Sequence, residues 1–360
     1  MGAAMAGVAR GLASGAKPSA GRAQFKGVFQ QLRTELVDEL GASYEVPTEL
    51  QEYLDYMAQY NVPGGKLNRG MAVVDTVAGV KGAPLERAEY FKAAALGWCV
   101  EFMQAFLLVA DDIMDNSLTR RGVPCWYQSP HIGMDAVNDA LILESFIYII
   151  LKKHFRNSPH YVSLMETFHD VTYRTELGQL LDLKTAPADD VDLSRFTMAK
   201  YNQIVKYKTG YYSFFLPVSL GMTLANVNEP QAFADAERIL LDMGRYFQIQ
   251  DDVLDCFGDP AVSGKIGTDI QDNKCTWLVV TALERASPDQ RRALENNYGR
   301  SDAFFVEAVK SIYRDLELEA EFRAYEAAAV AELEADISGF DHFDARVFSD
   351  LLAKIANRTK

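Results

Sequence analysis

Hydrophobic residues recur every three or four positions along most of the chain, which is the spacing of one helix face. Alternating hydrophobic and polar residues, which would indicate strands, are scarce. The pattern predicts helices over residues 93–110, 136–154, 161–184, 196–208, 232–257 and 276–286. We therefore expect an all-α fold, a single-domain helical bundle around a central cavity.

Short breaks rich in Pro, Gly, Asn or Asp separate these helices, at residues 61–65, 186–189, 258–260 and 287–289. From Gln24 onward the sequence contains neither a low-complexity linker nor a repeat of solenoid length. We therefore expect residues 24–360 to form one domain, preceded by a tail of residues 1–23. Helical bundles commonly build metal sites from side chains on facing helices.

One uncharged stretch, residues 209–228, has the length of a membrane-spanning helix. It contains eight residues that do not suit lipid, Tyr211, Tyr212, Ser213, Pro217, Ser219, Gly221, Thr223 and Asn226. Pro217 lies near its middle, which indicates a kinked helix buried in protein. We expect no transmembrane segment.

Composition narrows the class of protein. Hydrophobic residues make up 49% of the 360 residues, and charged residues 24%, as in a soluble globular protein. The net charge of −14 argues against nucleic acid as a partner. The four cysteines show no CxxC spacing and the five histidines no zinc pattern, so we expect reduced thiols, a cytoplasmic protein and oxygen ligands for any metal.

The first residues differ in kind from the rest. Arg10, Lys17, Arg22, Lys26 and Arg33 all precede the first acidic residue, Glu35. A basic, acid-free segment rich in small residues is typical of an organellar transit peptide. The tail of residues 1–23 is therefore either a targeting segment, mitochondrial or other, or a flexible extension without that role.

Two copies of one acidic pattern carry the chemistry. They are Asp111-Asp112-Ile-Met-Asp115 and Asp251-Asp252-Val-Leu-Asp255, each after a largely apolar stretch. Residues at i and i+4 share one helix face, so each copy directs two carboxylates at one point. Carboxylates gathered beside an apolar pocket need cations, and such hard oxygen ligands favour Mg²⁺ shared with substrate phosphates. The pattern predicts a diphosphate-binding Mg²⁺ site.

Basic residues follow both acidic segments. Arg120 and Arg121 come after the first, and successive guanidinium groups suit two phosphates or two substrates. Lys265 and Lys274 follow the second. The spacing of a nucleotide P-loop around Lys265 is absent, so we expect these lysines to act as point charges on a diphosphate.

Three other polar groups complete the candidate site. Lys66 and Arg69 lie in Gly64-Gly-Lys-Leu-Asn-Arg-Gly70, a glycine-flanked turn that opens a helix and suits a second anion. Gln179 and Asp182 share a face of a largely apolar helix, as a buried network or as part of the site. Lys208 and Thr209 precede the uncharged aromatic run and could supply a cation and a free carbonyl group.

These elements together resemble the trans-isoprenyl diphosphate synthases, and most closely their eukaryotic farnesyl diphosphate synthase branch. The resemblance spans residues 25–360. The matching segments are GGKLNRG, LVADDIMDNSLTRRG, GQLLDL, KYKTGYYSF, FQIQDDVLDCFGDP and GKIGTDIQDNKC. The family condenses an allylic diphosphate with isopentenyl diphosphate, so the resemblance implies a Mg²⁺-dependent prenyltransferase that makes farnesyl diphosphate from dimethylallyl and geranyl diphosphate.

The resemblance also implies roles for single residues. Asp111, Asp115 and Asp251 would hold three Mg²⁺ ions on the allylic diphosphate, with Asp182 in support and Asp112, Asp252 and Asp255 in the same acidic clusters. Arg120, Lys208 and Lys265 would bind that diphosphate, together with Lys274 and Gln179. The Thr209 hydroxyl, the Lys208 carbonyl and the Gln248 amide would meet the allylic cation, and Lys66, Arg69, Gln104 and Arg121 would place isopentenyl diphosphate.

One position departs from the family pattern. Animal-type members carry two aromatic residues at the fifth and fourth positions before the first aspartate, as a floor that limits chain length. Here Phe106 is present, but Leu107 replaces the second aromatic. Leu107 lies about one helical turn, ~6 Å, from Asp111, whereas Phe106 falls about 140° round the helix. We expect mainly a C15 product with some C20, and a geranylgeranyl or bifunctional C15/C20 synthase is the alternative.

Other functions remain to be compared. A terpene cyclase of the same fold would usually carry an Asn/Ser/Glu triad in place of the second motif, and a non-catalytic regulatory subunit would lack some of the aspartates. A calcium-binding structural protein would need an EF-hand loop, which is absent. The resemblance further implies a homodimer.

Overall fold

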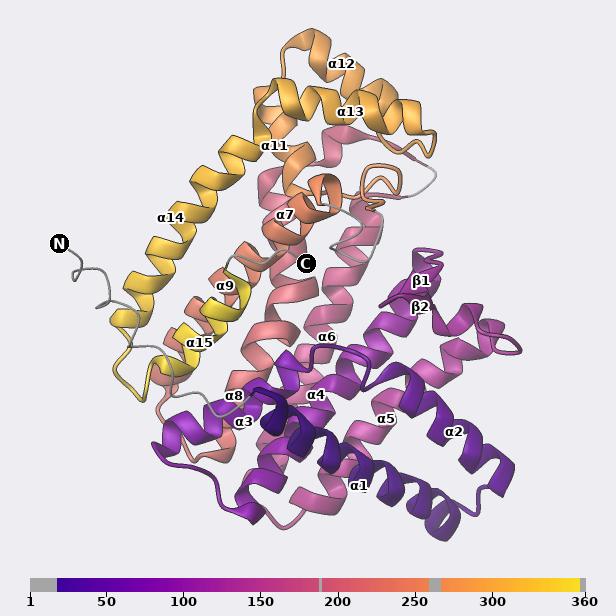
Figure 1. Cartoon of the computed structure of the whole chain (residues 1–360), viewed down its shortest axis with the longest axis vertical. Helices are drawn as coiled ribbons and strands as arrows, with labels where there is room; N and C mark the ends of the chain where they lie inside the picture. Colours follow the sequence, from indigo (N-terminus) through magenta and orange to yellow (C-terminus); the bar gives the residue numbers. More distant parts are fainter. Residues whose placement is uncertain (1–17, 188–189, 259–266, 357–360) are drawn as a thin grey trace, which may run out of the picture.

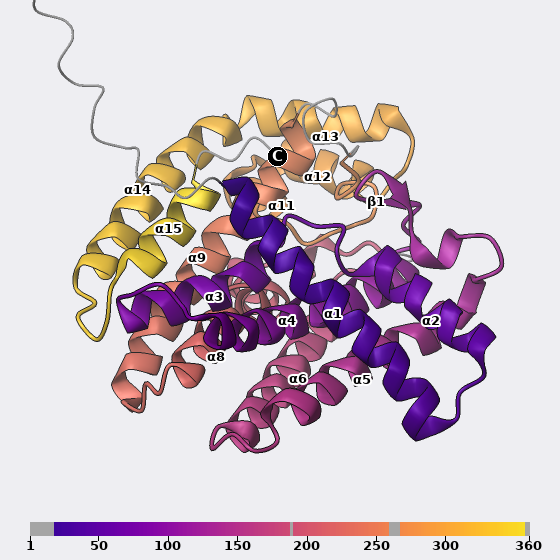
Figure 2. The same ribbon diagram turned by 60° about the horizontal axis from the view of Figure 1, so that its bottom comes forward.

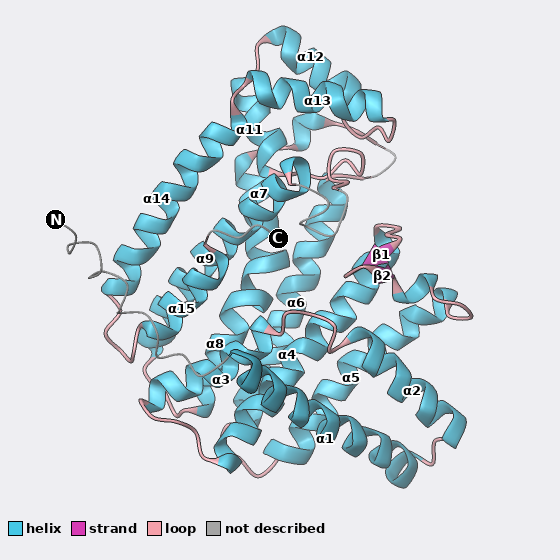
Figure 3. Ribbon diagram, viewed as in Figure 1, coloured by secondary structure: helices cyan, strands magenta, loops and turns pink. Residues whose placement is uncertain are grey.

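The computed structural model describes residues 18–187, 190–258 and 267–356. Helices make up nearly all of the secondary structure in these ranges, as Figure 3 shows. The prediction of an all-α fold is confirmed. The two strands, β1 (Thr119–Arg120) and β2 (Val123–Pro124), form one short antiparallel ribbon.

The centre of the molecule is built from long helices that lie roughly along one another (Figure 1). They are α4 (Arg87–Met114), α5 (Ala136–Phe155), α6 (Tyr161–Thr185) and α9 (Pro230–Phe257). Each contains a helix predicted from the periodicity. Between α6 and α9 a helical segment runs from α7 (Met198–Ile204) through η4 (Val205–Phe215) to α8 (Leu216–Leu224).

That segment corrects one predicted boundary. The expectation that the helix over residues 196–208 ends at Lys208 is wrong, because helical structure continues to Leu224. Its middle part, η4, is a π-helix of 11 residues, a conformation often found at functional sites. Pro217 is tolerated because it lies in the first turn of α8, where its missing N–H is not needed.

In the described part of the chain, further helices lie outside the predicted ranges. They surround the centre, with α1 (Pro18–Tyr44), α2 (Thr48–Asn61) and α3 (Asn68–Lys81) at one end and α12 (Pro288–Asn297) and α13 (Ala303–Asp315) at the other, and α14 (Leu318–Ser338) and α15 (Arg346–Ile355) along one side (Figures 1 and 2). The start of α12 was signalled by sequence, since Ser287 and Gln290 form a capping box. The helix α11 (Trp277–Arg285) completes the set, within the predicted range 276–286.

The first helix overlaps the N-terminal tail that was expected from the sequence. α1 begins at Pro18, inside the tail of residues 1–23, and the Arg22 Nη2 donates a hydrogen bond of 2.8 Å to the Lys66 carbonyl oxygen. Phe25 is fully buried and stacks on Trp98 at a centroid distance of 4.6 Å. Residues 18–23 thus continue the helix of the domain, and residues 1–17 lie outside the described ranges.

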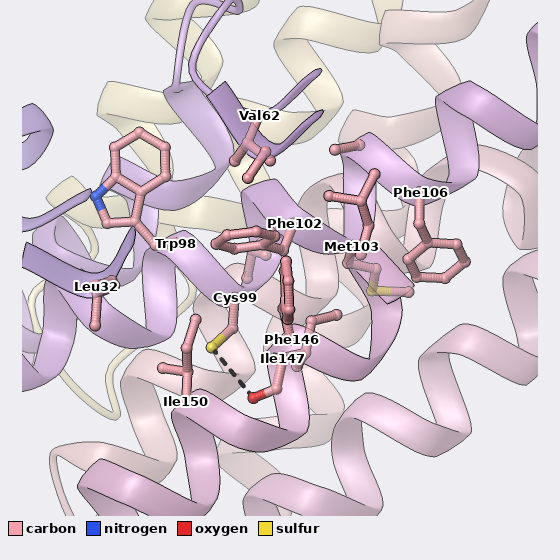
Figure 4. Close-up of a cluster of buried hydrophobic side chains, with 14 of the residues drawn as sticks. Leu32, Val62, Trp98, Cys99, Phe102, Met103, Phe106, Phe146, Ile147 and Ile150 are labelled. Carbon is pink, nitrogen blue, oxygen red and sulfur yellow. Dashed lines mark hydrogen bonds between the residues drawn. The ribbon is translucent and has the colours of Figure 1, made fainter. Parts of the chain in front are cut away.

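The largest hydrophobic core surrounds α4. Figure 4 shows Phe102 facing Phe146 of α5, and the Cys99 Sγ lies 3.9 Å from the Ile147 carbonyl oxygen, to which it donates a weak hydrogen bond. Among the described residues, α4 is the one helix long and apolar enough to cross a membrane, but 83% of its most apolar part is buried inside the protein. We interpret α4 as a core helix. Residues 209–228, considered above, fall in η4 and α8, whose side chains are mostly buried.

Candidate active site

The first acidic motif ends α4. Asp111 lies in the last turn and Asp115 is the C-cap residue. Carboxylates at a helix C-terminus face the negative end of the helix dipole, so they need positive partners. Lys274 supplies one, since its Nζ donates to the Asp115 Oδ1 at 2.8 Å. Lys208 supplies another, with its Nζ 3.3 Å from the Asp111 Oδ1.

A third carboxylate joins the same two lysines. Asp182 of α6 is buried, and its Oδ2 lies 2.6 Å from the Lys208 Nζ and 3.7 Å from the Lys274 Nζ. Gln179, one turn earlier on α6, donates to the Asp111 Oδ1 at 3.0 Å. Gln179 and Asp182 therefore lie on one face of α6 and contact the same cluster.

The charges in this cluster are unevenly balanced. Burial opposes ionisation of Asp111, but the positive charges of Lys208, Lys274 and Arg120 outweigh it and lower the pKa of Asp111. Burial and the negative charge of Asp111 raise the pKa of Asp115, although Lys274 opposes them. Carboxylates whose pKa values move apart in this way are close enough to repel each other, which is the situation that a bound cation relieves.

The middle aspartate of the first motif has a different position. Asp112 is buried and does not line the cavity described below. Its Oδ1 accepts a hydrogen bond of 2.9 Å from the Arg120 Nε and a second, shorter one from the Arg120 Nη2. Its carboxylate holds Arg120 in this structure, and the assignment of Asp112 as a metal ligand stays a prediction.

Arg120 and Arg121 point in different directions because of the β1–β2 turn. Arg121 has φ 56° and Gly122 φ 78°, so two successive residues are left-handed, as in a tight hairpin. Arg120, on β1, reaches back to the acidic motif. The Arg121 guanidinium lies beside Gly64 and Gly65, which have no side chains to obstruct it. The prediction that these arginines serve two separate groups matches this divergence.

The second acidic motif ends α9 and lines the same cavity. Asp251 and Asp255 belong to its lining, and the Asp255 Oδ1 accepts a hydrogen bond of 3.1 Å from the Asp269 backbone N–H. The two acidic motifs therefore line one cavity. Lys265, which follows this motif, lies outside the described residues.

Asp252, the middle residue, is buried among neutral donors. Its Oδ2 accepts from the Tyr201 hydroxyl at 2.7 Å and from the Trp277 backbone N–H at 2.8 Å, and its Oδ1 from the Gln248 Nε2 at 2.9 Å. Burial raises the pKa of Asp252 to about 7, against these hydrogen bonds. Three donors contact its oxygens, and the assignment of Asp252 as a metal ligand stays a prediction.

The cavity between the motifs has a volume of roughly 1280 Å³. Its polar end carries the carboxylates, Lys208, Lys274 and Arg120. Its wall away from these charges is mostly apolar and is lined by Phe106, Leu107, Ala110, Ile113, Val137, Ala140, Leu141 and Leu180, with Glu144 and Glu176 among them. A ligand with a charged head and a hydrocarbon tail fits this division.

The two residues of the expected floor, Phe106 and Leu107, both line the cavity. Phe106 is 6% exposed and lies at one edge of the core in Figure 4. Its position was not evident from the helical wheel, because the cavity extends round more of α4 than the face of Asp111. Leu107 is only partly buried and packs against the main core.

Glycines allow the π-helix to approach its neighbours. A Cβ on Gly178 of α6 would lie 2.2 Å from the Lys208 backbone N, and one on Gly244 of α9 would lie 2.8 Å from the Gly210 Cα. Neither contact is possible for a larger residue without movement. Close approach at these points brings Lys208 and Thr209 to the cavity, where the Thr209 Oγ1 donates to the Gln248 Oε1 at 3.0 Å.

A second basic region lies outside this cavity lining. The Arg69 Nε donates to the Ser213 Oγ at 3.0 Å, and its guanidinium lies 5.1 Å from the centre of the Tyr212 ring. Lys66 precedes α3, as the turn that opens a helix predicts. Gln104 is buried on α4, one turn after Glu101.

Glu101 links these groups and was not foreseen. It is 2% exposed, accepts a hydrogen bond of 2.7 Å from the Gly70 N–H, and burial raises its pKa despite the charges of Arg69 and Arg121. Desolvation lowers the pKa of Arg121, Glu101 opposes the shift, and Arg69 and Arg120 add to it. Positive charges that crowd one another in this way suit an anion. The mid-helix glutamate in the apolar run 93–110 was the available sequence signal for Glu101.

The residues fit Mg²⁺ by their chemistry. Among the carboxylates that line the cavity are Asp111, Asp115, Asp182, Asp251 and Asp255. Mg²⁺ is usually held by one or two carboxylates, waters and substrate phosphates, not by a complete protein cage. In the described ranges no three acidic, His or Cys side chains converge on a single point.

The chain is similar in sequence to known proteins. A family model described as polyprenyl synthetase matches residues 51–316. The chain is 49% identical over 348 residues to the farnesyl pyrophosphate synthase of Saccharomyces cerevisiae, covering 94% of this chain and 98% of that protein. It is 48% identical over 341 residues to the farnesyl pyrophosphate synthase of Gallus gallus, covering 94% and 93%.

The fold of the chain also matches solved structures. The crystal structure of T. brucei farnesyl diphosphate synthase matches with a TM-score of 0.86 at 35% identity, covering 94% of this chain and 99% of that one. The same T. brucei protein complexed with minodronate matches with a TM-score of 0.89 at 34% identity, covering 94% and 100%. The match over most of the sequence and the nearly half-identical relatives together show that the chain belongs to the polyprenyl synthetase family.

Proposed function

We propose that the protein is a prenyltransferase that condenses isopentenyl diphosphate with dimethylallyl diphosphate and then with geranyl diphosphate to give farnesyl diphosphate. The observation that carries the proposal is a single cavity in which two acidic motifs and three cations face an apolar wall. The relatives named farnesyl pyrophosphate synthase, which the chain matches over nearly its whole length, support the choice of product.

The allylic diphosphate belongs at the polar end of the cavity. Bound Mg²⁺, three ions by analogy with the family, would neutralise the departing diphosphate and so favour cleavage of the C–O bond. Asp111, Asp115 and Asp251 would hold the ions, with Asp182 and Asp255 beside them. Arg120, Lys208 and Lys274 lie close enough to bind the diphosphate oxygens, and Lys265 is assigned to the same task by resemblance.

The allylic carbon becomes positive as its bond to oxygen breaks and both electrons leave with the diphosphate. Thr209, the Lys208 carbonyl group and Gln248 surround the place where this charge develops. Their oxygens are partly negative, and in a cavity that excludes water such dipoles stabilise a cation strongly.

The second substrate belongs to the basic region of Arg69 and Arg121, with Lys66 and Gln104. Held there, isopentenyl diphosphate would present its double bond to the allylic carbon. The new C–C bond takes the two π electrons, and the resulting cation loses a proton to the diphosphate that has just left. Such positioning of two reactants can contribute roughly 7–11 kcal/mol.

The experiment is incubation with Mg²⁺, isopentenyl diphosphate and either dimethylallyl or geranyl diphosphate, with products identified by mass spectrometry. Farnesyl diphosphate as the main product supports the proposal. A cyclised hydrocarbon would favour a terpene cyclase. Folded protein without any condensation would favour a non-catalytic regulatory subunit.

We propose further that Leu107 allows some C20 product, because a leucine at this floor position is smaller than the phenylalanine of animal-type relatives. Comparison of the parent with Leu107→Phe tests this under the same conditions. A smaller C20 fraction in the variant is expected, and an unchanged product spectrum would show that Leu107 does not set chain length.

We also propose that two copies of the chain associate through α5 and α6. Tyr173 and Leu177 of α6 are 60% and 37% exposed. Val137 and Leu141 of α5 and Leu180 of α6, which also line the cavity, are 47%, 59% and 49% exposed. Neighbouring apolar residues on two adjacent helices are unusual on a monomer surface. Tyr173→Asp with Leu177→Asp should yield a monomer in light scattering, whereas Val162→Asp, near the start of α6, should leave the parental mass unchanged.

The compartment is a separate proposal. The acid-free basic composition of residues 1–23 supports organellar import, and the remainder of the chain suits the cytoplasm. A fluorescent fusion of the whole chain, compared with one that lacks residues 1–17, distinguishes the two. Identical distributions would exclude a targeting role for this segment.

A further inference from the structure

We propose that Asp252 is a positioning residue, which fixes the orientation of the Gln248 amide and thereby turns the lone pairs of the Thr209 hydroxyl toward the cavity. The inference rests on the proposed function, since it concerns how that function's allylic cation is stabilised. It assigns the second motif's middle aspartate a role other than metal binding.

The polarity of the hydrogen bonds begins at Asp252, which is 4% exposed. The Trp277 backbone N–H, at the start of α11, can only donate, and it meets the Asp252 Oδ2 at 2.8 Å. The Tyr201 hydroxyl donates to the same oxygen at 2.7 Å. Both of these donors meet Oδ2, and in the ionised form of Asp252 the remaining oxygen, Oδ1, accepts from the Gln248 Nε2 at 2.9 Å.

Gln248 transmits this polarity to Thr209. An amide has a donor end and an acceptor end, so a side chain that presents its Nε2 to Asp252 must present its Oε1 on the other side. The Oε1 lies 3.0 Å from the Thr209 Oγ1, which donates to it. A hydroxyl group has a single proton, so Thr209 keeps both lone pairs for other neighbours.

If the Gln248 amide had the opposite orientation, the direction of its hydrogen bond with Thr209 would be reversed. Gln248 would then donate to the Thr209 oxygen, occupy one lone pair and release the hydroxyl proton to point elsewhere. Thr209 and Gln248 both line the cavity. A proton directed into the cavity would repel a developing allylic cation, whereas lone pairs attract it.

The local sequence places the three groups in line. Gln248 and Asp252 are four residues apart on α9, so their side chains meet on one helix face. Thr209 reaches them because the π-helix η4 packs closely on α9 at Gly210 and Gly244. Tyr201 lies two turns before Thr209 in the same helical segment, on α7.

The decisive variant is Asp252→Asn, which should fold. The Asn oxygen can accept from Tyr201 and Trp277, and its amide can donate to a Gln248 that has turned over, so every buried group keeps a partner. The chain of bonds then runs in the opposite direction. We expect kcat to fall about a hundredfold, as for loss of one preorganised dipole, while KM and the half-saturating Mg²⁺ concentration change less than about threefold.

A binding measurement tests the same point without turnover. The probes are an allylic diphosphate analogue with a protonated amine at the reacting carbon and its neutral carbon isostere, each titrated calorimetrically with Mg²⁺ present. The parent should prefer the cationic analogue. Asp252→Asn should lose about tenfold of that preference, since one oriented dipole is reversed.

Thr209→Val and Thr209→Ser supply the second test with Asp252 intact. The valine variant should lose the same preference, because it has no lone pairs, and the serine variant should retain it. Asp112→Asn, the corresponding residue of the first motif, has no contact with Gln248 and should leave the preference ratio unchanged.

Three results would overturn the inference. The first is a rise in the half-saturating Mg²⁺ concentration of Asp252→Asn that matches its loss of activity, as expected of a metal ligand. The second is equal weakening of both analogues, as expected of a structural role. The third is a parental preference in Thr209→Val. Failure of the proposed function itself is separate, because it would appear in the parent as absence of farnesyl diphosphate.

Discussion

The two acidic motifs share one sequence pattern, yet tertiary surroundings give them different chemistry. In the first, charged partners surround the aspartates: Lys208 beside Asp111, Arg120 on Asp112 and Lys274 on Asp115. In the second, the partners of Asp252 are neutral, a tyrosine, a backbone N–H and a glutamine. The middle aspartates of the two motifs therefore differ in their partners, since Asp112 holds a charged arginine and Asp252 accepts from neutral donors.

The comparison also separates positions within each motif. In both copies the outer aspartates line the cavity and the middle one is buried, but Asp252 also belongs to the cavity lining whereas Asp112 does not. The middle residue thus has a similar task in each, to hold a functional side chain, but it holds a diphosphate-binding arginine in the first motif and a cation-facing amide in the second.

The outer aspartates should show the largest effect. Asp111→Asn and Asp251→Asn each remove a carboxylate from the cavity where metals are expected, so kcat/KM should fall about a thousandfold in both. Steady-state kinetics at saturating Mg²⁺ measure this, with Asp170→Asn on the exposed side of α6 as the control. Activity above about a tenth of the parent's in either variant would contradict an equal role for the two motifs.

The middle aspartates should then differ from each other. Asp112→Asn weakens the hydrogen bonds that hold Arg120, and bonds to charged groups are worth about 1.5–3 kcal/mol. We expect a higher KM for the allylic diphosphate at nearly constant kcat, whereas Asp252→Asn should mainly lower kcat. Kinetics with varied geranyl diphosphate separate the two, and a matching change in kcat for both would erase the distinction.

Packing behind the first motif can be tested at Gly178. In Gly178→Ala the new methyl group would meet the Lys208 backbone N at 2.2 Å, and overpacking of this kind costs about 1–3 kcal/mol. We expect a lower melting temperature and weaker diphosphate binding. Gly27→Ala, on α1 with open space around it, should be neutral or slightly stabilising. Equal melting of both variants would argue against the close contact.

Substitution of Lys274 should have the smallest effect. It should strengthen the binding of Mg²⁺ and weaken the binding of diphosphate. Lys274 competes with any metal for Asp115, so in Lys274→Gln Mg²⁺ alone should bind more tightly, by about 1 kcal/mol for one nearby charge. Binding of the diphosphate should weaken. Calorimetric titration with MgCl₂ and then with inorganic diphosphate measures both. Weaker Mg²⁺ binding in the variant would show that the lysine supports the metal site.

Much of the architecture follows from local pattern. The long apolar periods predict the ends of α5, α6 and α9 to within two residues and those of α4 to within six, because each helix buries a continuous hydrophobic face. The peripheral helices were not predicted from hydrophobic periodicity. α14 is one example, since few of its side chains are buried and its hydrophobic periodicity is weak.

The candidate site, like the fold, could be predicted from the sequence only in part. The residue types and the spacing of i and i+4 were sufficient to predict carboxylates that converge with lysines and arginines on a diphosphate, because that inference needs only helix geometry and charge. They did not distinguish the middle aspartates from the outer ones. Asp112 and Asp252 were assigned to metal because nothing in the motif reveals which carboxylates already have donors.

The sequence by itself determined the helical fold, the family, the acidic pairs and the presence of two basic groups, since each depends on periodicity or on short motifs. Tertiary structure alone decided which carboxylates face the cavity, how Arg120 and Arg121 diverge, and how Asp252, Gln248 and Thr209 align. The partners that fix those orientations, such as Trp277, Tyr201 and Gly178, are distant in sequence. Their contacts form only when helices pack, so no local pattern records them.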